Sequence, residues 1–315
     1  MNKKKIIKYG IIVILLVNLI FIAVGNYFYS IIMDFNKKNL YTKDRYKQEI
    51  QELKINNQEL EKLKAEGLLL DSAFAYKINA KLYLQPQATT KTVILVHGNG
   101  KDHKWSAMKY APIFLRQGFN VLVYDSRNHG QTGGYNPSYG FYEQEDLQTI
   151  VEFLQKRYPQ GKLGVHGESM GAATALMHAA KYANTKQVDF YIADCAYSDL
   201  YDLYYLRSAD YSIPPILRPV ILNYLSLVCK TRSGFWLSEV SPKANIADIE
   251  TPILFIHGSK DDFVPTEMST VLFNEKKGIK AIYYAQGAEH ARALNVDLQL
   301  YQEAINNFLV QFDWQ

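Results

Sequence analysis

A short glycine-flanked turn, Gly-Glu-Ser-Met-Gly at residues 167–171, constrains this chain more than any other feature of its sequence. An apolar run at residues 162–166 predicts a buried strand before the turn, and small residues at 172–183 predict a helix after it. A strand-to-helix turn this tight strains the backbone of Ser169 and presents its hydroxyl at the edge of a sheet. Both glycines are needed, because a Cβ would collide with the neighbouring strand or helix.

The rest of the main domain alternates short apolar strands with helices, which is typical of a parallel sheet covered on both faces. The expected strands cover residues 68–74, 78–84, 92–96, 120–124, 162–166, 189–193, 252–257 and 280–284. The expected helices cover residues 105–116, 142–158, 172–183 and 296–312. At 315 residues and 48% hydrophobic content, the chain is able to bury one substantial core.

Charge and metal-ligand patterns exclude several classes of function. The net charge is only +4, and much of the basic excess precedes residue 65, so we expect no nucleic-acid partner. The seven histidines form no zinc-type pair, and Cys195 and Cys229 lack metal-ligand spacing, so we expect no metal. A bridge between the two cysteines stays open, but two buried thiols are favoured.

Residues 1–33 predict a membrane anchor. An uncharged stretch at residues 9–33 is long enough to cross a bilayer as a helix, and lysines precede it at positions 3, 4, 5 and 8. A cleaved signal peptide is the rival, because residues 23–25, Ala-Val-Gly, resemble a cleavage site, but the apolar run continues beyond them. The lysine cluster favours a single-pass protein of the cell membrane with its main domain outside, although basic residues at 37–47 oppose this orientation.

Two further segments complete the expected organisation. Residues 34–66 are polar with a thin apolar stripe, which predicts a helical stalk; a coiled-coil dimer is the alternative, and we expect a monomer. The domain at 67–315 contains an insertion at about 197–245 that is rich in tyrosine and aliphatic residues. A connection this long is often a lid over a functional site, and a helical layer that completes the core is the other interpretation.

Ser169 has candidate partners in the order that an activated serine needs. A serine hydroxyl requires a base, and the base requires an orienting acid. Asp261 follows the expected strand at 252–257, and His290 follows the last strand, so both lie at the same sheet edge as Ser169. Asp262 and Asp194 are alternative acids, whereas His290 alone among the histidines lies on the final loop.

Two backbone N–H groups are candidates for stabilising the negative charge on a substrate oxygen. The N–H of Met170 lies at the positive end of the expected helix after Ser169. The N–H of Asn99 belongs to the loop His-Gly-Asn-Gly at residues 97–100, where glycines let the backbone approach a substrate.

An ordered set of motifs over residues 67–312 resembles the α/β-hydrolase superfamily, in the branch of serine aminopeptidases, monoacylglycerol lipases and prolyl-oligopeptidase catalytic domains. Within it the chain is most similar to membrane-anchored, extracytoplasmic bacterial hydrolases. The motifs are His97-Gly98-x-Gly100, Asp125-Ser126-Arg127-Asn128-His129-Gly130 with Gly133-Gly134, Gly140-Phe141-Tyr142-Glu143 with Asp146, Gly167-x-Ser169-Met170-Gly171, His257-Gly258-x-x-Asp261-x-x-Val264-Pro265 and His290-Ala291. The resemblance implies an eight-stranded, mostly parallel sheet, a Ser169–His290–Asp261 triad and no cofactor. Ala293 departs from the serine often found there, which touches no catalytic role.

The sequence therefore predicts a serine hydrolase that acts through an acyl-enzyme on an ester, thioester or amide of a small or lipid-like acyl substrate. A carboxylesterase or lipase-like activity is the first interpretation, and a peptidase or an acyltransferase on the same triad is the alternative. An aminopeptidase needs an acid for the substrate amine, for which Asp202, Asp210 and Glu239 are candidates. The non-enzyme alternative is a membrane-tethered binding protein on a hydrolase scaffold.

Overall fold

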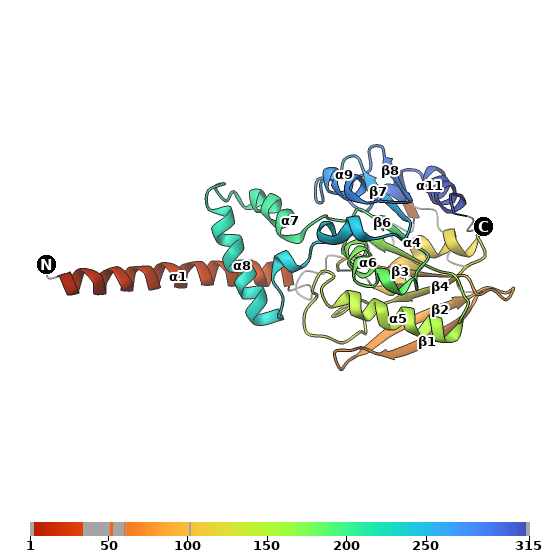
Figure 1. The fold of residues 1–315 in the computed structure, drawn as a ribbon, viewed down its shortest axis with the longest axis horizontal. Helices are drawn as coiled ribbons and strands as arrows, with labels where there is room; N and C mark the ends of the chain where they lie inside the picture. The colour runs from red at the N-terminus through yellow and green to blue at the C-terminus, as the bar shows by residue number, and fades with distance from the viewer. Residues whose placement is uncertain (1–2, 34–50, 53–59, 61, 101, 313–315) are drawn as a thin grey trace. The chain divides into compact units, whose positions relative to one another are not determined.

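The structure, a computed structural model, describes residues 3–33, 51–52, 60, 62–100 and 102–312. It contains two compact units (Figure 1). The helical unit comprises Met1–Lys38 and Leu200–Glu239, and the sheet unit comprises Asn39–Asp199 and Val240–Gln315. Most of the predicted stalk at 34–66 lies outside the described residues, but its last part, from Lys64, belongs to the first strand of the sheet.

The sheet unit is built on eight strands in the order β1-β2-β4-β3-β5-β6-β7-β8 (Figure 1). β1 pairs antiparallel with β2 and β2 with β4, while all other neighbours are parallel, which confirms the predicted sheet. The strands are β1 (Lys64–Asp71), β2 (Lys77–Leu84), β3 (Thr92–Val96), β4 (Asn120–Tyr124), β5 (Leu163–Glu168), β6 (Phe190–Asp194), β7 (Ile253–Gly258) and β8 (Lys280–Ala285).

Helices cover both faces of the sheet, as the apolar strands predicted. The helices of this unit are α4 (His103–Leu115), α5 (Glu143–Arg157), α6 (Met170–Lys181), α9 (Thr266–Glu275), α10 (Ala293–Val296) and α11 (Leu298–Val310). Buried side chains of α5, α6 and α9 share one core with alternate strand residues such as Ile94 and Val96. Side chains of α4 and α11 share the other with Val93 and Leu95. Each central strand is thus buried on both faces.

Three elements differ from the sequence-based expectation. β1 runs from Lys64 to Asp71 rather than over 68–74, because a turn closed by the Ser72 N–H on the Tyr76 carbonyl (2.9 Å) ends the strand and sets its register. α9 was not predicted. The closing helix expected at 296–312 is α11, Leu298–Val310, which begins two residues later because the Asp297 side chain caps it by accepting the Leu300 N–H (2.9 Å).

The helical unit holds α1 (Lys3–Met33), α7 (Leu200–Arg207) and α8 (Arg218–Ser233). α1 is the one helix among the described residues that is long and apolar enough to cross a membrane; over its most apolar window the mean hydropathy is 2.6, and that window is not buried within the protein. The insertion predicted at about 197–245 supplies α7 and α8, and its part of this unit ends at Glu239.

Candidate active site

The turn around Ser169 has the strained geometry that the sequence predicts. Ser169 has φ 55° and ψ −115°, and α6 begins at the next residue. A Cβ on Gly167 would lie 2.3 Å from the Gly171 carbonyl oxygen, and one on Gly171 would lie 2.2 Å from that of Val96. Both distances are prohibitive, so only glycine lets β3, β5 and α6 approach closely enough to hold Ser169 at the carboxyl edge of the sheet.

The three predicted side chains form one hydrogen-bonded chain. Ser169 Oγ lies 2.9 Å from His290 Nε2, and His290 Nδ1 lies 2.7 Å from Asp261 Oδ2. The other carboxylate oxygen of Asp261 accepts the N–H groups of Phe263 (3.1 Å) and Val264 (2.9 Å). The carboxylate is therefore fixed from both sides, and the imidazole is oriented toward Ser169.

Asp261 is buried but remains ionised. Burial by itself would raise the pKa of this carboxyl, but hydrogen bonds from His257 and His290 outweigh it and lower the pKa to about 2. His257, part of the motif that contains Asp261, lies 3.2 Å from Asp261 Oδ2, and its Nε2 lies 2.8 Å from the Val264 carbonyl. Sequence reasoning missed this second contact, whose one signal is the His257–Asp261 spacing.

The two alternative acids lie elsewhere. Asp262 is exposed. The Asp194 carboxylate accepts hydrogen bonds from the hydroxyls of Tyr301 (2.9 Å) and Tyr110 (3.3 Å), while its backbone carbonyl accepts the Ser169 N–H (2.8 Å). Asp194 therefore supports the turn, whereas Asp261 contacts the histidine.

The loop at residues 97–100 lies directly beside Ser169. A Cβ on Gly98 would be 2.9 Å from Glu168 Oε1 and 3.4 Å from Ser169 Cβ. His129, which sequence reasoning left unassigned, holds this loop by accepting the Gly100 N–H (3.1 Å), while its Nδ1 lies 2.8 Å from the Arg127 carbonyl. Burial lowers the pKa of His129, so it stays neutral and able to accept. Among the described residues, nothing bonds to the N–H of Met170 or Asn99.

The sequence of this chain matches known proteins. The family model of the alpha/beta hydrolase fold matches residues 91–212. The uncharacterized protein YqkD of Bacillus subtilis is 37% identical over 292 residues, which covers 91% of this chain and 92% of that protein. The chain belongs to the α/β-hydrolase superfamily.

Two more distant matches add to this picture. An esterase of Pyrococcus furiosus has the same fold, with a TM-score of 0.64 and 22% identity over 81% of this chain and 94% of its own. An uncharacterized membrane protein of Saccharomyces cerevisiae is 26% identical over 187 residues, 58% of each chain.

A buried charged network, missed from the sequence, supports this hydrolase-fold site. Lys109 Nζ donates to Glu168 Oε2 (2.7 Å) and to the carbonyl of Ala291 (2.5 Å), the residue after His290. Tyr110 also donates to Glu168 Oε2 (2.6 Å). Both side chains of the Lys109–Glu168 pair are fully buried. Through Lys109, the residue before Ser169 (Glu168) is therefore connected to the residue after His290 (Ala291). The available signal was a lysine and a glutamate within otherwise apolar runs.

Cys195 contributes a third polar atom near the acid and the base. Its sulfur lies within 4.8 Å of ligand atoms of Asp261 and His290, the one such metal-type cluster found in the described part of the chain. Burial raises the pKa of this thiol well above its usual value, so it stays protonated and is a poor metal ligand. Asp261 and His290 are already bonded to each other. Cys195 and Cys229 are both free, buried thiols.

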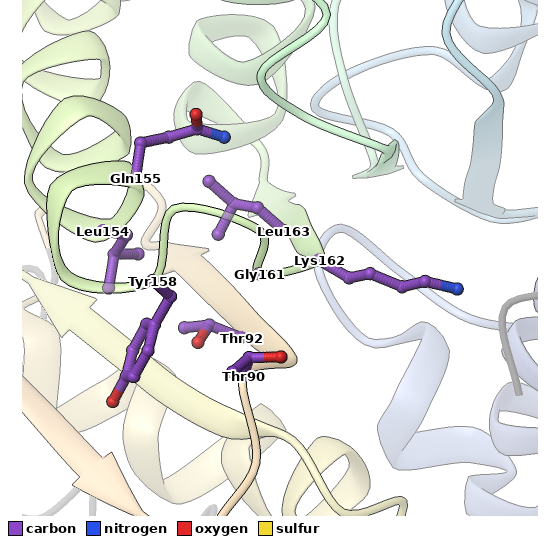
Figure 2. Close-up of a pocket in the computed structure, with 8 residues that line it drawn as sticks. All are labelled: Thr90, Thr92, Leu154, Gln155, Tyr158, Gly161, Lys162 and Leu163. Carbon is purple, nitrogen blue, oxygen red and sulfur yellow. The ribbon is translucent and has the colours of Figure 1, made fainter.

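A hollow of about 180 Å³ opens at the opposite edge of the sheet, where β3 and β5 begin (Figure 2). Its lining includes Thr90, Thr92, Tyr158 and Lys162. A Cβ on Gly161 would lie 2.7 Å from the Thr90 carbonyl oxygen, so the walls meet closely. The hollow is partly open to solvent, and it lies at the start of β3 and β5, whereas Ser169 follows the end of β5.

Proposed function

We propose that this chain is a serine hydrolase that cleaves a carboxylic ester through an acyl-enzyme, with Ser169 as nucleophile, His290 as base and Asp261 as orienting acid. The observation that carries the proposal is the continuous hydrogen-bonded chain from Ser169 Oγ through His290 to Asp261. Chains of this type convert a weak hydroxyl nucleophile into a reactive one. The esterase neighbour has the same fold.

In the first half-reaction, Ser169 Oγ attacks the ester carbonyl carbon, and its proton moves to His290 Nε2. The oxygen that becomes negative accepts hydrogen bonds from the N–H groups of Met170 and Asn99, a stabilisation of roughly 3–4 kcal/mol for each donor. The intermediate then collapses: the bond to the alcohol breaks, and the alcohol takes the proton from His290. The acyl group remains on Ser169.

In the second half-reaction, His290 accepts a proton from water while the water oxygen attacks the acyl carbon. The tetrahedral intermediate breaks its bond to Ser169 Oγ, which regains the proton from His290, and the carboxylic acid leaves. Throughout, Asp261 accepts the hydrogen bond from His290 Nδ1 (2.7 Å) and stabilises the imidazolium. The lowered pKa of Asp261 keeps it ionised for this role.

An ester substrate is favoured over a peptide. Two of the three acids proposed to hold a peptide's amine already have a cationic partner: Asp210 pairs with Arg207, and Glu239 pairs with Lys230 (3.2 Å). A substrate ammonium group would have to compete with these two cations.

The test compares p-nitrophenyl esters of increasing acyl length with aminoacyl p-nitroanilides, using the full chain and its Ser169→Ala variant. We expect hydrolysis of the esters alone, lost in Ser169→Ala. Cleavage of the anilides in preference to the esters would replace the esterase by a peptidase, and ester turnover equal in both proteins would remove Ser169 from the mechanism.

We also propose that α1 remains in the mature chain as a single-pass anchor, with the sheet unit outside the cell. Its 31 residues span about 46 Å at 1.5 Å per residue, more than the roughly 30 Å hydrocarbon core. Retention of residues 3–33 in membrane-extracted protein, read by mass spectrometry, tests the anchor; cleavage after Gly25 would show a signal peptide instead.

A further inference from the structure

α1 and α8 cross with their backbones in contact at Gly25. A Cβ on Gly25 would lie 2.8 Å from the backbone carbon of Tyr224 and 2.9 Å from the nitrogen of Leu225. One turn earlier on α1, the ring of Phe21 stacks on that of Tyr224, with centroids 5.3 Å apart. Small residues at such crossings are typical of helices that pack within membranes, where close approach replaces the hydrophobic effect.

Polar side chains on the apolar helix α1 find their partners on α8. Tyr224 donates to Asn18, Arg232 donates to Asn26 Oδ1 (2.6 Å), and Tyr29 and Ser233 share a hydrogen bond of 2.7 Å. A polar group that faces hydrocarbon without a partner is costly. Three polar residues of α1, Asn18, Asn26 and Tyr29, therefore have their partners on α8.

The crossing has a definite depth if α1 spans the bilayer. Gly25 lies sixteen residues after Tyr9, where the uncharged stretch begins, which is about 24 Å along the helix. With a hydrocarbon core of about 30 Å, the crossing lies roughly 6 Å inside the outer boundary. Within the helical unit α8 runs across α1 rather than along it (Figure 1). That depth and direction are those of a helix lying flat in a membrane interface.

The segment that leads into α8 exposes apolar side chains. Ile216 is 83% exposed, Tyr211 48% and Leu217 40%. Tyr211 also packs edge-on against Phe28 of α1, with ring centroids 5.1 Å apart, which joins this segment to the anchor. Residues 211–236 contain three basic and no acidic side chains, Arg218, Lys230 and Arg232, of which Lys230 also pairs with Glu239 (3.2 Å). Apolar exposure beside a basic helix matches the chemistry of an anionic lipid surface.

We propose that residues 211–233 form a second membrane contact: α8 lies in the outer interface against α1, and Ile216 and Leu217 insert among the acyl chains of anionic lipid. This inference rests on the proposed anchoring by α1. In this proposal, residues 211–233 of the insertion belong to the membrane-bound part of the protein and are not surrounded by water.

The test uses the full chain in vesicles of phosphatidylcholine and phosphatidylglycerol. An environment-sensitive NBD probe is attached at Ile216→Cys, with Leu69→Cys on β1, 66% exposed, as the matched control and unsubstituted protein as the background for the buried native thiols. Spin-labelled acyl chains and aqueous iodide serve as quenchers.

We expect the probe at position 216 to be quenched several-fold more by the acyl-chain label than the probe at position 69, and to be protected from iodide. Equal iodide quenching at both positions in protein that resists alkaline extraction would overturn the interfacial contact and leave the anchor standing. Release of the protein by alkaline extraction would overturn the anchor, and this proposal with it.

Discussion

Ser169 and Gly25 lie in different compact units, and each lies beside a backbone contact that only glycine permits. Near Ser169, a Cβ on Gly171 would lie 2.2 Å from the Val96 carbonyl oxygen; on α1, a Cβ on Gly25 would lie 2.8 Å from Tyr224. The side chains around the two contacts differ in charge. The first contact is enclosed by buried charges such as the Lys109–Glu168 pair, whereas the second is joined mainly by amide and hydroxyl side chains.

This difference follows from what each region must hold in place. The turn at Ser169 keeps a residue at φ 55°, a strain of about 1–3 kcal/mol, and in the proposed mechanism it aligns three side chains for proton transfer. Charged hydrogen bonds such as that of Lys109 to Glu168 are directional enough to do so. The α1–α8 crossing only has to keep two helices together, for which close packing and a few neutral hydrogen bonds suffice.

We expect the largest effect from removing the negative charge of Asp261, at the carboxyl edge of the sheet. Asp261→Asn removes the acceptor that orients His290 and stabilises its protonated form, so we expect kcat to fall by about 10⁴-fold. The measurement is steady-state hydrolysis of a soluble short-chain ester. Asp262→Asn changes the exposed neighbouring carboxylate and is expected to keep full activity; equal losses in the two variants would contradict the assignment.

The buried ion pair gives the next largest effect. Lys109→Met removes the cation beside the buried Glu168 carboxylate, which we expect to lower the free energy of unfolding by about 3–5 kcal/mol, as measured by urea denaturation. Its lost bond to Ala291 should lower kcat by about tenfold with KM unchanged.

The double variant Lys109→Met/Glu168→Gln separates these two roles. It removes the unpaired charge, so stability should largely return, whereas kcat should stay low because the Ala291 contact is still missing. Recovery of kcat together with stability would mean that Lys109 acts through folding alone.

The pH dependence of stability gives a smaller effect. The fold lowers the pKa of Asp261 to about 2, so its carboxylate contributes stability above the ordinary pKa near 4 that disappears as the pH falls toward 2. At neutral pH, Asp261→Asn should be less stable than the unchanged chain by about 2 kcal/mol. Urea unfolding across acidic pH should show the two proteins converging; a gap that widens on acidification would contradict the lowered pKa.

The smallest effect concerns the helix crossing. Gly25→Leu overpacks the contact with α8, and we expect tryptic cleavage after Arg232 to rise about tenfold, which corresponds to about 1.4 kcal/mol in local opening. Hydrolysis of a soluble ester should be unchanged. Gly10→Leu is the matched control, because nothing lies within 4 Å of a Cβ there. Equal cleavage in both variants would break the comparison between the two glycine contacts.

Local patterns predicted much of the sheet. β3 and β4 occupy the expected residues, 92–96 and 120–124, because a continuous apolar run between polar ends leaves little freedom in where a buried strand begins. α9 was missed because its residues follow the Asp261 loop without a strong apolar stripe. The start of the last helix depends on one N-cap, Asp297, whose side-chain hydrogen bond to the Leu300 N–H fixes where α11 begins.

For the candidate site, chain order and strand ends were enough to bring Ser169, Asp261 and His290 together. The contacts that support them were not predictable in the same way. Lys109 and Glu168 are 59 residues apart, and His129 and Gly100 are 29 apart, so neither pair leaves a local pattern. Such pairs are fixed by the packing of whole elements, which the sequence pattern describes only coarsely.

Labelling with a fluorophosphonate probe tests the central claim most directly, because the probe reacts with a serine only when a neighbouring base activates it. The full chain in membranes is compared with Ser169→Ala, with circular dichroism showing that both are folded. We expect one labelled site in the unchanged chain, mapped to Ser169 by mass spectrometry, and none in the variant. Absence of labelling in the folded chain, or equal labelling of Ser169→Ala, would contradict the account.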